Sequence, residues 1–194
     1  MARTEEANKR LREAQRAKIL NGARKVFARK GWAATMADVA EAAEVSQGLA
    51  YRYFANKEAI FRELVENSLQ SGLAMMQHIL EMPGTPREKL DFLISRVLAN
   101  KRERIEFYQL IVQAFNNEAT PDDICKLLRR QGQTFQNVVR QLIVEGQANG
   151  EFAEGDPDQL VMAVIACLDG LSRLALRNPE HFPDTRIILR MLKP

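Results

Sequence analysis

A short polar segment between residues 46 and 57 carries side chains suited to contact with double-stranded DNA. Gln47 can form two parallel hydrogen bonds with an adenine edge and Arg52 with a guanine edge, while Leu49 can touch a thymine methyl group. Gly48 removes a side chain where the backbone can come close to a nucleic acid. Threonine, tyrosine and lysine side chains can reach phosphate oxygens. The candidate DNA contacts are therefore Thr35, Ser46, Gln47, Gly48, Leu49, Tyr51, Arg52 and Lys57.

Two short helices must position these side chains. Thr35 can cap the first helix, with Asp38 three residues later as its capping-box partner. This helix has one apolar face at helical spacing, formed by Met36, Val39, Ala40 and Ala43. After a tight junction at 43–45, Ser46 can cap a second helix over 47–54. The polar residues of the second helix cannot all be buried, so the pair has the pattern of a helix-turn-helix that enters a major groove.

With these motifs, residues 16–62 resemble the N-terminal domain of the tetracycline-repressor (TetR) family of bacterial transcription regulators. The resemblance rests on an ordered set of positions, namely Gly31, Trp32, Thr35, Gly48, Tyr51, Tyr53, Phe54, Lys57, Glu58 and Ile60. It implies an all-α fold, with a basic arm and helix-turn-helix domain in residues 1–57 and a helical effector-binding and dimerisation domain in residues 58–194. Tyr51 and Lys57 are the DNA contacts that it supports most directly.

The chain departs from the family pattern at two points. Glu44 stands in the turn where the family usually has glycine, and a non-glycine residue there costs about 1–2 kcal/mol if the backbone is left-handed. Leu49-Ala50 stands where the family tends to have a polar residue followed by leucine. Contact of Leu49 with a base is therefore the part of the readout that the resemblance supports least.

Charge is distributed unevenly over the 194 residues. The net charge is +3, but residues 1–57 hold 12 Lys and Arg against 6 Asp and Glu, whereas residues 58–194 hold 16 against 19. A basic first part joined to a mildly acidic second part indicates a polyanionic partner for the first part alone. A solvated basic surface would have the same composition, so charge by itself leaves both interpretations open.

Composition also bounds the compartment and the chemistry. Cys125 and Cys167 are too few and too far apart for a disulfide framework. Together with His78 and His181 they have no metal-ligand spacing, so we expect neither a metal nor another cofactor. The charged start has no apolar core, and the longest apolar run, Leu160–Leu168, is nine residues, far short of a membrane span. We expect a soluble cytoplasmic protein with no membrane contact.

The first 30 residues divide into an arm and a packed helix. Residues 1–15 form a basic arm, helical or frayed, whose Arg3, Lys9, Arg10 and Arg12 can reach a minor groove or phosphates, or can simply be solvated. A helical apolar stripe follows, consisting of Ile19, Leu20, Ala23, Val26 and Phe27. We expect Gly31 to close this helix as a C-terminal cap and Trp32 to pack beneath the helix-turn-helix.

The remaining chain has helical patterns, with no sustained strict alternation. Asn56 can cap a long helix from Lys57 to about Met82 that serves both domains, with Leu73, Met76, Ile79 and Leu80 in the second core. Further helices are expected at about 86–101, 103–115, 121–149, 157–177 and 184–192, with starts at Thr85, Thr120 and Asp156 and ends at Asn116-Asn117, Asn149-Gly150 and Asn178-Pro179.

The expected helix 157–177 has a bulky side, Val161, Ile165, Leu168 and Leu171, and a narrow side of small residues. Small residues let two helix axes approach closely, so the narrow side is a candidate dimer interface, although packing within one chain would use the same pattern. TetR-like proteins dimerise through their last two helices, and a two-fold dimer presents its recognition helices to major grooves about 34–36 Å apart. Asp169 needs a partner if buried, across the dimer or at Arg173. The candidate dimer residues are Ala163, Ala166, Cys167, Gly170, Arg173, Ile187 and Met191.

Aromatic residues and methionines lie along the expected helices of the second domain, and such side chains can line an adaptable apolar pocket. Plain core packing is the alternative for each of them. The resemblance implies a small-molecule effector, apolar or amphipathic, that binds here, shifts the long helix and releases DNA. The candidate pocket residues are Met75, Met76, His78, Phe92, Phe107, Tyr108, Phe115 and Phe135.

These observations favour a regulator, most simply a repressor, that binds a palindromic operator as a homodimer and is not an enzyme. An all-helical enzyme is one alternative, but no Gly-rich phosphate loop, paired metal ligands or credible Ser/His/Asp set supports it. A protein-interaction module with a vestigial helix-turn-helix is another, which Glu44 keeps open. If the helix-turn-helix did not bind DNA, Tyr51 would be a packing residue and Arg52 a solvated surface charge.

Overall fold

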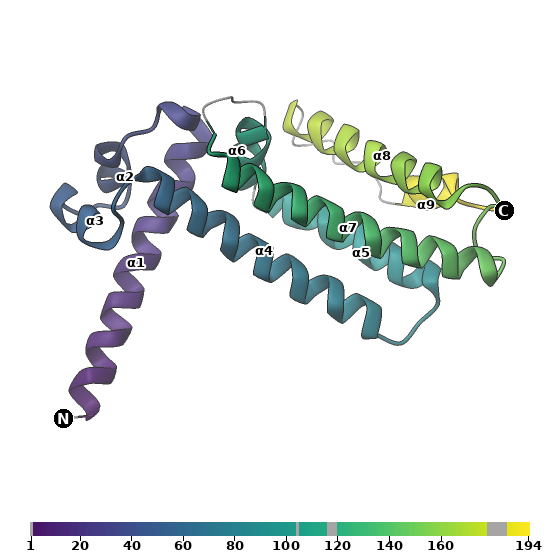
Figure 1. Ribbon diagram of the computed structural model, residues 1–194, viewed down its shortest axis with the longest axis horizontal. Helices are drawn as coiled ribbons and strands as arrows, with labels where there is room; N and C mark the ends of the chain where they lie inside the picture. The colour runs from purple at the N-terminus through teal and green to yellow at the C-terminus, as the bar shows by residue number, and fades with distance from the viewer. Residues whose placement is uncertain (1, 104, 116–119, 178–185) are drawn as a thin grey trace. The chain divides into compact units, whose positions relative to one another are not determined.

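The computed structural model of the protein describes residues 2–103, 105–115, 120–177 and 186–194. All regular structure in these ranges is helical, which confirms the predicted all-α class, and none of these helices has the length and apolar content needed to cross a bilayer. In chain order the elements in Figure 1 are α1 (Ala2–Lys30), a 3-10 turn (Gly31–Ala33), α2 (Met36–Ala42), α3 (Gln47–Tyr53), α4 (Lys57–Glu81), α5 (Pro86–Glu103), α6 (Ile105–Phe115), α7 (Asp122–Ala148), α8 (Pro157–Arg177) and α9 (Arg186–Met191).

Packing divides the chain into two compact units that do not follow chain order. The N-terminal unit comprises Met1–Ser68 and Glu106–Leu127, and the C-terminal unit comprises Leu69–Ile105 and Leu128–Pro194. Packing therefore groups α6 and the first turns of α7 with the helix-turn-helix. This division by packing differs from the functional division after residue 57 that the resemblance implies, which remains a proposal.

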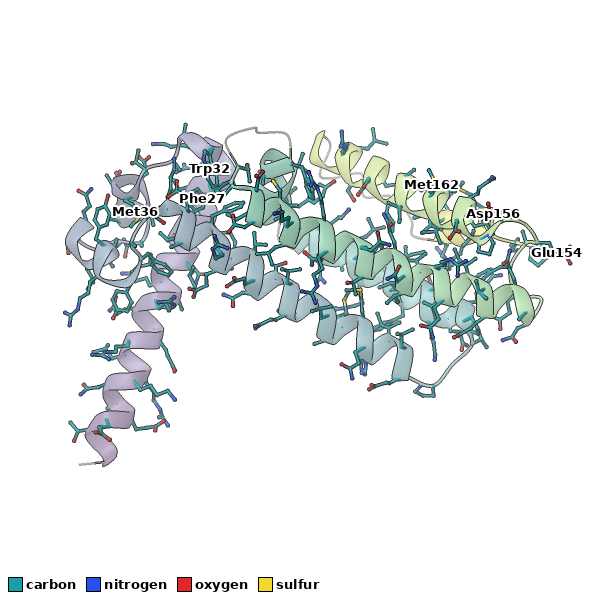
Figure 2. The ribbon with its side chains drawn as sticks, viewed as in Figure 1. Phe27, Trp32, Met36, Glu154, Asp156 and Met162 are labelled. Carbon is teal, nitrogen blue, oxygen red and sulfur yellow. The ribbon has the colours of Figure 1, made fainter. Side chains whose placement is uncertain are left out.

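The core of the N-terminal unit lies where the apolar faces of α1, α2 and α4 meet. The predicted stripe of α1 and the predicted face of α2 are buried. Phe61 of α4 is fully buried, and its ring meets the rings of Phe27 and Trp32 edge-on, with centroids 5.8 and 5.1 Å away. Phe27, Trp32 and Met36 are labelled in this unit in Figure 2. This aromatic cluster gives the helix-turn-helix a rigid base.

Glycines decide how α1 ends and how closely the turn packs on it. A Cβ atom at Gly22 would lie 2.7 Å from the backbone nitrogen of Ala43 and 2.9 Å from its Cα, so any side chain would push the turn away from α1. Gly31 has a φ of 56°, the left-handed conformation predicted for the cap that ends this helix.

The C-terminal core is built by α4, α5, α7, α8 and α9, with α5 packed against both α8 and α9. The bulky side of α8 is buried or packs against this core, as predicted. The assignment of Leu73 to the core is wrong, because its side chain is 46% exposed. The inward face of α4 passes through Gly72, where an added Cβ would lie 3.0 Å from Gln131 Nε2 of α7. Each residue turns an α-helix by about 100°, so Leu73 points past the packed face.

Most predicted helix starts are confirmed by their hydrogen bonds. Reciprocal capping boxes join Thr35 with Asp38 and Thr85 with Glu88, and single caps are made by Ser46, Asn56 and Asp156. Thr120 is the exception. Its hydroxyl is buried and has no hydrogen-bond partner among the described residues, and α7 begins at Asp122, with the Pro121 carbonyl accepting the first bonds. The predicted ends at Asn116-Asn117 and Asn178-Pro179, and residues 184–185 of the predicted last helix, lie outside the described residues.

Candidate nucleic-acid interface

α3 buries one side and leaves its polar side free. Ala50 is fully buried, and Phe54, directly after the helix, is 3% exposed. The expectation that the polar residues of this helix are not all buried is therefore confirmed, and the side chains able to pair with base edges share one open face. The residues on that face are Gln47, Gly48, Tyr51 and Arg52, with Leu49 half-buried at its edge.

The turn between α2 and α3 contains a strained residue. Glu44 has a φ of 49°, the left-handed conformation whose cost for a non-glycine residue is about 1–2 kcal/mol. Lys18 Nζ lies 3.4 Å from both the carbonyl oxygen and the carboxylate of Glu44. This contact is exposed and offsets little of the strain. The left-handed turn that the sequence motif requires is thus present even though its glycine is absent.

Asp38 ties the start of α2 to the end of α1. Its carboxylate accepts hydrogen bonds from Lys30 Nζ at 2.6 Å and from the backbone nitrogen and hydroxyl of Thr35, both at 2.9 Å. The Thr35 hydroxyl in turn accepts from the Asp38 backbone nitrogen at 3.2 Å. Because its proton is used in this box, Thr35 has none left for a phosphate in the free protein. In the structure Thr35 holds the start of α2.

Acid should weaken this cap. The hydrogen bond from Lys30, together with those from Thr35, lowers the pKa of Asp38 from 3.8 to about 2. A depressed carboxylate pKa contributes stability that is complete above the unfolded value of 3.8 and is lost as the pH falls through about 2. Asp38→Asn should therefore melt below the wild type near neutral pH, and the difference should vanish at the acid end of this window. Melting curves across it check this, with Glu41→Gln as the control, and a pH-independent difference would contradict it.

Lys57, at the start of α4, is held by Trp32. Its Nζ donates to the Trp32 carbonyl oxygen at 2.5 Å and lies 5.4 Å from the centre of the indole ring. An ammonium has three N–H donors, so this bond leaves two for an anion. The first turn of α4 adds backbone N–H groups and the positive end of a helix dipole. Lys57 is thus fixed in place and still able to bind a phosphate.

Gly48 has no packing role inside the described chain. It is exposed, and an added Cβ would have no heavy atom within 4 Å. Glycine in a helix costs about 0.5–1 kcal/mol relative to alanine. The absence of a side chain at Gly48 can therefore matter only for contact with another molecule that approaches α3.

Gly48→Ala should stabilise the fold by about 0.5–1 kcal/mol and weaken DNA binding at the same time, since the new methyl group would stand between α3 and a groove. Denaturant unfolding and DNA retention of one preparation measure the two effects. Gly132→Ala in α7 is the matched control, because an added Cβ is equally unobstructed there and that helix is not part of this interface. Unchanged DNA affinity of Gly48→Ala would contradict the argument.

A second free surface lies on α8 and α9 of the C-terminal unit. Four of the predicted dimer residues on α8 are exposed: two alanines, a glycine and an arginine. The fifth, Cys167, is half-buried and packs against the core. On α9, Ile187 and Met191 are 54% and 57% exposed, whereas the residues that follow each of them are buried. The predicted dimer residues with exposed side chains or backbone are Ala163, Ala166, Gly170, Arg173, Ile187 and Met191.

Two further large residues of this surface are not among the dimer residues predicted from the sequence. Met162, labelled on α8 in Figure 2, is 71% exposed and Leu174 is 60% exposed. They continue the line of Ala166 and Gly170 at intervals of four residues, and this spacing is the signal that could have identified them. Exposed large apolar side chains gathered on one helix face mark an interaction surface.

Asp169, on the same helix, pairs with a residue far away in sequence. Its Oδ1 lies 3.1 Å from Lys101 Nζ of α5, 68 residues earlier, rather than beside Arg173 on its own helix. Burial lowers the pKa of Lys101, and the neighbouring Asp169 carboxylate opposes this shift. The pair therefore ties α8 to α5.

The eight candidate pocket residues are divided between the two units. Met76 is buried in the C-terminal core, and Met75 and Phe135 pack against it. His78 and Phe92 lie on the surface of that unit. Tyr108 and Phe115 belong to the N-terminal unit, where Phe115 is 51% exposed, and the side chain of Phe107 lies outside the described residues.

Polar amides lie beside the methionines of α4. Asn100 Nδ2 of α5 is 3.8 Å from Met75 Sδ, and Gln131 of α7 lies against Gly72, one turn before Met75. The described side chains include no group of three or more His, Cys, Asp and Glu able to hold a metal. This part of the core therefore combines adaptable apolar side chains with two hydrogen-bonding groups.

Comparison with known families matches both parts of the chain. Residues 19–64 match the family described as bacterial regulatory proteins, tetR family. Residues 86–192 match the C-terminal region of BetI-type transcriptional repressors. The second match covers more than half of the chain, including α5 to α9.

Individual proteins show the same likeness. The chain is 29% identical over 180 residues to the HTH-type transcriptional regulator YfiR of Bacillus subtilis, covering 89% of this chain and 85% of the relative. The solved structure of the MbdR regulator from Azoarcus sp. CIB has a TM-score of 0.79 at 24% identity, covering 91% of this chain and 96% of that one. That of the transcriptional regulator FadR from Bacillus subtilis in complex with stearoyl-CoA has a TM-score of 0.71 at 22% identity, covering 90% and 96%. At these identities the structures show a shared fold.

Proposed function

The chain belongs to the TetR family of bacterial regulatory proteins, and we propose that it is a non-catalytic repressor that binds a palindromic DNA operator as a homodimer. The free face of α3 carries this proposal. Gln47 and Arg52 are exposed there, while Ala50 behind them is fully buried, so these polar side chains can enter a groove without unpacking the unit. Gln47 reads adenine and Arg52 reads guanine, while Tyr51 and Lys57 bind phosphates.

The dimer forms through α8 and α9. Their exposed face combines small residues, which allow close approach of two helices, with four large apolar side chains whose burial in an interface is favourable. With a two-fold axis through this face, each copy of the protein uses the same patch in the contact. The dimer then presents two copies of α3, one to each half of a palindrome. The residues of this face are Met162, Ala163, Ala166, Gly170, Arg173, Leu174, Ile187 and Met191.

An apolar or amphipathic effector binds in the C-terminal unit, beside Met75, Met76 and Phe135. Asn100 and Gln131 supply hydrogen bonds to its polar end. The acyl-CoA held by the FadR of similar fold is a molecule of this amphipathic class, and it is the first probe to use. Release of DNA requires that the effector bind one arrangement of α4 better than the other, with about 5.5 kcal/mol of difference for a 99:1 to 1:99 reversal.

Selection of bound duplexes from a random DNA pool tests this function. We expect a palindromic consensus from the wild-type protein. For Arg52→Ala we expect an affinity lower by about 1–3 kcal/mol and relaxed preference at one base position of each half-site, because one bidentate contact is lost. Arg96→Ala, an exposed arginine of α5, is the control and should keep the wild-type consensus. A selection that yields no consensus would reject the proposal, and an unchanged consensus for Arg52→Ala would remove that residue from the readout.

A further inference from the structure

The first half of α1 packs against no other part of the chain that the structure describes. Figure 1 shows that it continues well past α2 and α3 of the same unit as a single rod. Every residue from 4 to 14 is exposed, including Leu11 at 60%. Burial begins only at residues 15 and 16, so packing in the core of the unit does not explain why the residues before them form a helix. An isolated helix of this length is marginal in water, which favours a role in contact with something else.

Arg16 sets the direction of one face of this rod. Its guanidinium forms a paired contact with the carboxylate of Glu63, with 2.7 Å between Nε and Oε1, and lies 4.5 Å from the centre of the Phe54 ring. Its Nη1 is 3.5 Å from the carbonyl oxygen of Tyr53. Tyr53 is the last residue of α3, and Phe54 follows it directly. The face of α1 that carries Arg16 is therefore turned toward the end of α3.

Two cations continue that face outward along the rod. Successive residues of an α-helix are about 100° apart, so Lys9 and Arg12 lie within about 20° and 40° of the direction of Arg16. Neither has an ion-pair partner in the part of the chain that the structure describes, whereas Arg10, on the other side, is 3.5 Å from Glu6. Two acids lie near these cations: Glu5 shares the face in the first turn, where an acid stabilises the helix dipole, and Glu13 lies about 60° from the direction of Arg16.

We propose that Lys9 and Arg12 bind backbone phosphates of the DNA that flanks each operator half-site. The inference rests on the proposed function, because it needs α3 in a groove. Lys9 lies about 10 Å and Arg12 about 6 Å beyond Arg16 along the helix, so both lie past the end of α3. The arm adds affinity and length of footprint but reads no bases.

Two variants and two duplexes test this contact in the full-length protein. Arg12→Gln and Arg10→Gln each remove one positive charge from the exposed rod, two residues apart, but only Arg12 lies on the face toward α3. The short duplex ends with the selected palindrome, and the long one adds about ten base pairs, one helical turn, on each side. For Arg12→Gln on the long duplex we expect affinity lower by on the order of tenfold and a salt slope lower by about 1.8 per dimer, since two phosphate contacts are lost. On the short duplex it should equal the wild type, and Arg10→Gln should equal the wild type on both.

The outcomes separate the two levels of the argument. If the wild type binds the long and short duplexes equally, or if both variants lose the same affinity, the arm makes no such contact and the inference is overturned while the proposed function stands. If the wild type retains neither duplex, the proposed function fails instead. Far-UV circular dichroism of each variant shows whether the helix content, and so the rod, is retained.

Discussion

Ala166→Arg is expected to convert the protein into a monomer that no longer retains operator DNA at concentrations where the wild type does. Ala166 is exposed at the centre of the line from Met162 to Leu174 on α8, so the fold of the single chain should tolerate the change. In a two-fold interface the same residue of both copies faces the contact, which places two like charges where two helices must come close. Loss of one half-site per complex then lowers operator affinity by about 10²–10⁴-fold.

Light scattering or sedimentation measures the first effect and gel retardation the second. Gln136→Arg, which adds the same charge at an exposed position of α7 in the same unit, is the matched control and should remain a DNA-binding dimer. A dimeric Ala166→Arg protein would move the interface elsewhere. A monomeric wild type that still retards operator DNA would remove the need for a dimer altogether.

Phe61→Ala should cost about 3–5 kcal/mol of stability, a large part of the 5–15 kcal/mol that is usual for a folded protein. Its ring is fully buried between Phe27 and Trp32, and removal leaves a cavity that neither neighbour can fill from its edge-on position. Because Trp32 also holds Lys57 through its carbonyl oxygen, the loss should reach the proposed phosphate contact of Lys57 as well.

Denaturant unfolding with a fixed wild-type reference measures the cost, and retention of the selected duplex measures the consequence for binding. Leu73→Ala removes a large apolar side chain from the same helix at a 46% exposed position and should cost much less. Similar unfolding midpoints for the two variants would show that the aromatic cluster is not the base of the helix-turn-helix.

The family motif identified the recognition helix, and the structure explains why its exposed face could be anticipated. Ala50 and Phe54 are the apolar residues of that segment that can turn inward together, so Gln47, Tyr51 and Arg52 had to remain outside. What the motif could not show is that Lys30 also donates to the Asp38 carboxylate of the predicted capping box. A capping box is local, but Lys30 reaches it only because α1 ends beside the start of α2.

The candidate dimer and effector residues show the limit of helical spacing. Spacing separates one side of α8 from the other, but it does not say which side meets the rest of the chain. The bulky side does, which leaves the small residues free, together with Met162 and Leu174. For the effector site, residue type alone grouped surface side chains such as Phe92 with buried ones such as Met76, because aromatic and thioether side chains are used in both places.

The sequence by itself determined the helices of this protein, their caps and the helix-turn-helix motif, because these depend on residues within about four positions of each other, where backbone hydrogen bonds and caps close. Only the tertiary structure decided that Gly22 lies under Ala43, that Asp169 pairs with Lys101, that Thr120 is buried, and that Leu73 is exposed. Each of these depends on which faces of distant helices meet, and that choice is made by close packing of the whole core rather than by any local pattern.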